Sequence, residues 1–92
     1  VPTLSWEQAN AIYEVRGILE AEAAARCAER ITPDQLASLE AALVGFARAT
    51  ASDDSLGRVS TTADFYAIIM ANCGNPVLEE LHRGLLARIT FF

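Results

Sequence analysis

Apolar residues recur along this chain with the three-and-four spacing of an α-helix, in four successive segments. In the first segment the recurring positions are Ile12, Val15, Leu19, Ala23 and Cys27. Ser5 and Gln8 form a capping box, in which each side chain accepts a hydrogen bond from the other residue's free backbone N–H. This pattern predicts a helix from the Ser5 cap to about Arg30.

A second start follows at once, with Thr32 as N-cap, Pro33 in the first helical position and Gln35 two residues later. The apolar stripe beyond it consists of Leu36, Leu39, Leu43 and Phe46, widened by Ala47. Its apolar character ends near Thr50, where the turn-forming residues 52–55 follow. We therefore predict a second helix over about 33–50.

A third helix is predicted from about Leu56 to Cys73, although its β-branched stretch at 59–62 has a low intrinsic helix preference. Gly74 ends it, because glycine readily adopts the left-handed conformation found just beyond helix ends. Asn75 then caps a fourth helix that opens on Pro76. The apolar face of this last helix is Val77, Leu78, Leu81, Leu85 and Ile89.

These four segments indicate an all-α protein, since no segment shows the period-two alternation of a strand. The connections are short and favour antiparallel neighbours, so we expect an antiparallel helical bundle in one domain over residues 1–92. The 52% share of hydrophobic residues, with 21% charged, is typical of a globular chain.

Charge and targeting signals narrow the class of function. A net charge of −5 argues against direct nucleic-acid binding, which normally needs a basic surface to neutralise phosphates. No apolar run is long enough to cross a bilayer, and residues 1–3 open no signal peptide, so we expect a cytoplasmic protein without a membrane partner. No nucleophile elbow, phosphate-binding glycine loop or zinc-protease motif is present, so we do not expect an enzyme.

Three stretches, taken in their order and spacing, resemble the C-terminal domain of FadR-type regulators of the GntR superfamily. Residues 12–20 (IYEVRGILE), with the alanine-rich run to 28–32, resemble the family's opening "evR..lE" helix and its end. The capped, leucine-rich helix over 33–50 is the second stretch. Residues 64–66 (DFY) followed by 71–76 (ANCGNP) resemble the motif "D..FH..l..asgNp.l".

The resemblance implies a bundle of roughly six or seven helices that follows a winged-helix DNA-binding domain. Such domains form dimers and bind a small effector, often a carboxylate. The chain would then hold about four helices of a partial domain, and the missing initiator Met fits a start partway through a longer protein. We expect a homodimer, or another partner segment, to cover the remaining apolar faces, and DNA contact only through the absent N-terminal domain.

Many members also hold a divalent metal through one Asp and three His. At the first two of these positions the resemblance places Thr62 and Tyr66, while Asp64 is two residues off and points elsewhere on a helix. The other two histidines would belong to helices beyond Phe92. We therefore expect no metal and no other cofactor.

Four residues are candidate effector ligands. Arg16 can grip a carboxylate with two parallel hydrogen bonds; the alternative is a salt bridge to Glu20 at i+4 or a solvated side chain. Thr62 and Tyr66 share one helix face and offer hydroxyls, or else are ordinary core residues. Met70 is assigned to the same cavity, where simple packing is the alternative.

The remaining reactive side chains have structural interpretations. His82 is the single histidine and pairs most simply with Glu79 on the surface. Cys27 and Cys73 are expected to be reduced, small buried groups. The leading hypothesis is an effector-binding, dimerising domain of a FadR-type regulator; the alternative is a helical interaction module without a ligand pocket.

Overall fold

The structure is a computed structural model that describes residues 4–89. Residues 1–3, on which the prediction about a signal peptide rests, lie outside the described residues. Within residues 4–89 the chain forms helices and no strand. The helices are α1 (Trp6–Arg30), α2 (Pro33–Ala51), α3 (Ser55–Ala71) and α4 (Pro76–Ile89). The predicted all-α class is confirmed.

Both predicted capping boxes are present. The Ser5 hydroxyl accepts from the Gln8 backbone N–H at 3.1 Å, and the Gln8 side chain accepts from the Ser5 N–H at 2.9 Å. Thr32 and Gln35 repeat the arrangement at 3.3 and 2.9 Å. Each box satisfies two of the four backbone N–H groups that a helix start leaves free, so local sequence alone determines where α1 and α2 begin.

The ends of α3 differ from the prediction in detail. Asp54, assigned from sequence to a turn, is its N-cap and accepts from the Gly57 N–H at 2.9 Å. The helix ends at Ala71, two residues before the predicted Cys73. Asn75 caps α4 as expected, because its side-chain oxygen accepts from the first amides of that helix at 3.0 and 3.1 Å.

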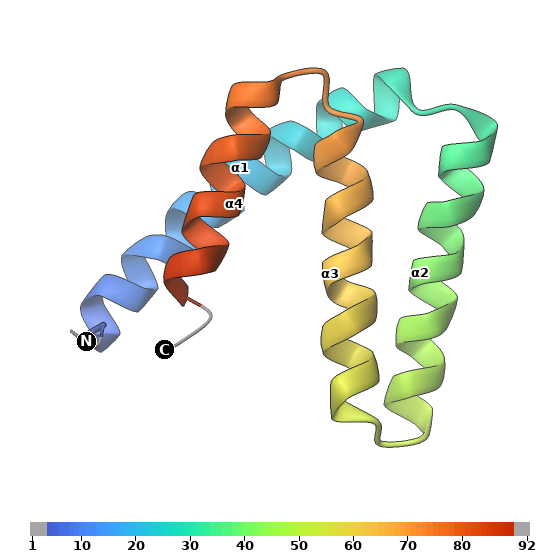
Figure 1. Cartoon of the computed structure of the whole chain (residues 1–92), viewed down its shortest axis with the longest axis horizontal. Helices are drawn as coiled ribbons and strands as arrows, with labels where there is room; N and C mark the ends of the chain where they lie inside the picture. Colours follow the sequence, from blue (N-terminus) through green and yellow to red (C-terminus); the bar gives the residue numbers. More distant parts are fainter. Residues whose placement is uncertain (1–3, 90–92) are drawn as a thin grey trace.

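The helices form two antiparallel pairs, α2 with α3 and α1 with α4, in a flat molecule of 42 × 35 × 18 Å (Figure 1). The α2–α3 hairpin extends away from the end of the molecule at which α1 ends and α4 begins. The axes of α3 and α4 diverge from the turn at 72–75, so the start of α3 and the end of α4 are well separated. This divergence positions the site described below.

The core lies at the junction where α1, α3 and α4 meet. Its buried members are Ala23, Cys27, Ile69, Met70, Cys73 and Leu78. Both cysteines are free thiols, as expected. Burial, and then the neighbouring Cys73, raise the pKa of the Cys27 thiol, so this group stays protonated and packs as a small apolar side chain.

Leu39 of the α2 stripe is half-buried and packs against that core, but the other large residues of the stripe are more exposed. Leu36, Leu43 and Phe46 are between 41% and 53% exposed, whereas Ala42 and Ala49 are the buried residues of α2. Small side chains are therefore the fully buried part of the α2 face toward α3, and Leu43 and Phe46 lie beside them, where they line spaces shared with α3 residues such as Thr62. Periodicity alone located the stripe but could not show how deeply each of its residues would be buried.

Gly74 is the position where an added side chain should cost backbone strain. Its φ is +75°, and we expect Gly74→Ala to lower the free energy of unfolding by about 1–2 kcal/mol, because L-residues disfavour that region. Urea denaturation would measure the change. The matched control is Gly84→Ala in α4, where an added Cβ meets nothing within 4 Å and should stabilise by about 0.5–1 kcal/mol. Equal effects of both variants would contradict the prediction.

Candidate functional site

A cavity of about 520 Å³ opens where α3 and α4 diverge, and all four helices contribute to its lining. The lining residues are Arg16, Phe46, Arg58, Val59, Thr62, Ala63, Tyr66 and Leu86. Three of the four sequence-predicted candidates, Arg16, Thr62 and Tyr66, therefore lie around one space. The arrangement joins a guanidinium from α1 with two hydroxyls from α3, against otherwise mostly apolar walls.

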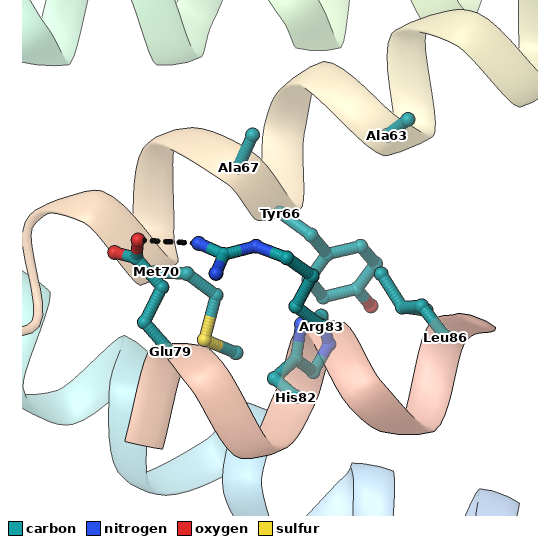
Figure 2. Close-up of a pocket in the computed structure, with 8 residues that line it drawn as sticks. All are labelled: Ala63, Tyr66, Ala67, Met70, Glu79, His82, Arg83 and Leu86. Atoms are coloured by element: carbon teal, nitrogen blue, oxygen red, sulfur yellow. Dashed lines mark hydrogen bonds and ion pairs between the residues drawn. The ribbon is translucent and has the colours of Figure 1, made fainter. Parts of the chain in front are cut away.

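Met70 lies elsewhere. It is buried and lines a smaller, adjacent cavity of about 190 Å³ between α3 and α4. Figure 2 shows this second space, with Tyr66 reaching from α3 toward α4 and the Arg83 side chain held by Glu79 beside it. Tyr66 lines both cavities, so Met70 neighbours the predicted site through Tyr66 and does not line the larger cavity.

For Arg16 the structure shows one of the two interpretations that the sequence left open, and contact with a ligand stays a prediction. Its Nη2 and Nε donate to Glu20 Oε2 at 3.0 and 3.3 Å, which is the i,i+4 pair proposed as the alternative. A guanidinium carries five N–H donors, and this pairing uses two of them. Because Arg16 also lines the larger cavity, the ion pair holds the side chain in place without excluding contact with a ligand.

His82 corrects the sequence interpretation. It is only 3% exposed, and its Nε2 lies 2.7 Å from Glu20 Oε2, sixty-two positions away in the chain. Glu79, its predicted partner, instead binds Arg83 at 2.8 Å. A carboxylate can only accept hydrogen bonds, so the imidazole donates from Nε2. The sequence pattern could have indicated this burial, because His82 stands at helical spacing from Leu78 and Leu85 and therefore on the buried face of α4.

Glu20 therefore accepts hydrogen bonds from both Arg16 and His82 through one oxygen. The side chains of Arg16 and Glu20 are 17% and 16% exposed, so these bonds are only partly screened by water. These hydrogen bonds link α1 to α4 and hold the Arg16 side chain in place at the wall of the larger cavity. The sequence predicted the Arg16–Glu20 pair of this network but not the contact between Glu20 and His82.

The donor set does not fit a divalent cation. Thr62 and Tyr66 occupy the positions where the resemblance places a carboxylate and an imidazole, and neutral hydroxyls are poor substitutes for either. Among residues 4–89 no three His, Cys, Asp or Glu side chains gather in a way that could hold a metal. Within the same residues, no helix has the length and apolar character that crossing a membrane requires.

The sequence matches the FCD domain family over residues 11–92, which includes all of the helical chain except the first turn or so of α1. No curated protein and no solved structure matches the chain. FCD domains are regulatory rather than catalytic: they are the effector-binding domains of GntR-family transcription regulators. The helical architecture agrees with that assignment. The chain thus belongs to the FCD domain family, the C-terminal domain of GntR-family regulators.

Proposed function

We propose that this chain is the ligand-sensing and dimerising part of a cytoplasmic, FadR-type regulator whose effector is a small carboxylate. Arg16, Thr62 and Tyr66 bind the effector without a metal or another cofactor. A separate winged-helix domain contacts DNA, and effector binding changes how that domain is presented. The net charge of −5 supports leaving DNA contact to another domain.

One observation carries this proposal: the larger cavity brings Arg16, Thr62 and Tyr66 together from two helices. A guanidinium recognises a carboxylate with two parallel, charge-assisted hydrogen bonds. The two hydroxyls add neutral donors and acceptors, while apolar residues such as Phe46 and Leu86 offer contact to the apolar part of a ligand. Its volume of about 520 Å³ lies within the range of small-molecule sites.

Thermal unfolding in the presence of a panel of organic acids tests the proposal. An acid at about ten times its Kd should stabilise the protein by roughly 1.4 kcal/mol, or about 5 °C or more for a domain of this size. We expect Arg16→Ala to lose most of that shift. Arg48→Ala, which removes an exposed α2 arginine outside the cavity lining, should respond like wild type. A panel without any stabilising acid would refute the ligand assignment.

A helical interaction module without a ligand is the second candidate. The exposed apolar side chains of α2, Leu36, Leu43 and Phe46, favour it, because large uncovered apolar surfaces commonly mark interfaces. Light scattering coupled to size-exclusion chromatography separates the two. Self-association that is unaffected by every acid, with no thermal stabilisation, would support the interaction module over the sensor.

A further inference from the structure

We propose that the ligand of the larger cavity is a linear dicarboxylate, with one carboxylate on Arg16 and the other on Arg58. This inference rests on the proposed function and makes it more specific. Arg58 was not among the residues that the sequence singled out. It lines the same cavity as Arg16 but comes from α3 instead of α1, so the two guanidinium groups belong to different walls.

The helix register of α3 places Arg58 with the other predicted ligands. Arg58, Thr62 and Tyr66 stand at i, i+4 and i+8, so they follow one another along a single face. The periodicity that connects the two hydroxyl residues therefore extends one turn toward the start of the helix. Arg58, at the N-terminal end of this face, adds a positive charge to the side of the cavity that Thr62 and Tyr66 line.

The charges around the cavity are unusual for so acidic a chain. The lining formed by the described residues contains two arginines and no carboxylate, although the whole protein carries −5. The carboxylates that neighbour these arginines, Glu20 for Arg16 and Asp53 for Arg58, do not line the cavity. A ligand with two negative charges would therefore meet a cationic group at each of two places in an otherwise mostly apolar lining.

Arg58 can exchange its present partners for a ligand. Its Nη1 lies 3.8 Å from Asp53 Oδ1, and the Asp53 side chain is 99% exposed, so this contact is long and strongly screened. Its Nη2 donates to the Ser55 hydroxyl at 3.2 Å, a neutral acceptor. A ligand carboxylate offers a stronger, charge-assisted bond than either. Arg16 is thus held in place, and Arg58 adapts.

The rest of the lining favours a chain over a compact dianion. Phe46, Val59, Ala63 and Leu86 are apolar and suit methylene groups. A compact ion such as phosphate would leave these residues without contact. A linear dicarboxylate has two charged ends and an apolar middle, which matches the two arginines and the apolar walls.

Isothermal titration with matched acids tests the inference. The probes are succinate, glutarate and adipate, compared with butyrate, valerate and hexanoate of the same chain lengths, and with inorganic phosphate. We expect at least one dicarboxylate to bind about tenfold or more tighter than its monocarboxylate, since a second charge-assisted contact is of that size. Arg58→Gln should abolish this advantage by lowering dicarboxylate affinity far more than monocarboxylate affinity. Arg48→Gln, which removes one exposed α2 arginine, should preserve the advantage.

The outcomes separate this inference from the proposed function. If monocarboxylates bind as tightly as dicarboxylates, or Arg58→Gln keeps the tenfold advantage, the second contact is refuted and the sensor proposal stands. Phosphate binding at least as tightly as every dicarboxylate overturns the linear ligand. If no acid binds wild type, both proposals fail. Circular dichroism confirms that the Arg58→Gln variant is folded, which the partly exposed position of this residue leads us to expect.

Discussion

Glu20→Leu should lower the free energy of unfolding by about 2–4 kcal/mol, although Glu20 stands behind the cavity wall and not on it. One carboxylate oxygen accepts from Arg16 and from His82, and its loss leaves both donors unpaired. The His82 side chain is only 4% exposed, so water cannot replace the bond. Breaking a buried pair typically costs about 3–5 kcal/mol, and the partial exposure of Arg16 reduces that figure. Urea denaturation measures the effect.

The control is the other carboxylate of α1 that forms an i,i+4 pair. Glu22 accepts from Arg26 at 3.0 Å, but these side chains are 57% and 38% exposed. Glu22→Leu should therefore change stability by no more than about 0.5 kcal/mol. A cost similar to that of Glu20→Leu would mean that burial of the network is not the cause.

A double-mutant cycle isolates the contact between α1 and α4. His82→Leu continues the apolar stripe of Leu78 and Leu85 and leaves Glu20 bonded to Arg16. We therefore expect it to lower the free energy of unfolding by less than Glu20→Leu does. In the double variant with Glu20→Leu no imidazole is left buried without a partner. The combined cost should then fall below the sum of the single costs by at least about 1 kcal/mol. Additive costs would show that the two residues act independently.

The helix boundaries could be predicted because the interactions that set them are local. Ser5 with Gln8, Thr32 with Gln35, and Asn75 with the amides after it act within three residues, so adjacent positions in the sequence contain the whole interaction. Misassigning Asp54 to a turn rather than to a cap is an error of the same local kind. It moves a boundary without changing the fold.

The site was predicted only in part because its decisive contacts join distant helices. Helical spacing paired Thr62 with Tyr66, which both line the larger cavity, and Arg16 with Glu20, of which Arg16 lines it. No spacing rule relates Glu20 to His82, which meet only after α4 packs beside α1. The same packing places Met70 in the core and second cavity.

Gly45→Ala should lower the free energy of unfolding by about 1–3 kcal/mol, although alanine is the better helix former. A Cβ at Gly45 would lie 2.8 Å from Thr61 Cγ2, closer than real side chains approach. The threonine cannot readily turn away, because its hydroxyl donates to the Gly57 carbonyl at 2.8 Å. The helices α2 and α3 must therefore separate, and thermal unfolding would record the loss.

Two further variants show whether that close approach is the cause. Gly17→Ala makes the same change in α1, where an added Cβ meets nothing within 4 Å, and should stabilise by about 0.5–1 kcal/mol. Thr61→Ser removes the Cγ2 methyl and keeps the hydroxyl, so Gly45→Ala in that background should lose its cost. If Gly45→Ala stabilises wild type as Gly17→Ala does, the glycine does not set the spacing of α2 and α3. If the penalty persists with serine, the Thr61 methyl is not its source. The spacing matters for the site because Phe46 follows Gly45 and Thr62 follows Thr61 on these two walls of the cavity.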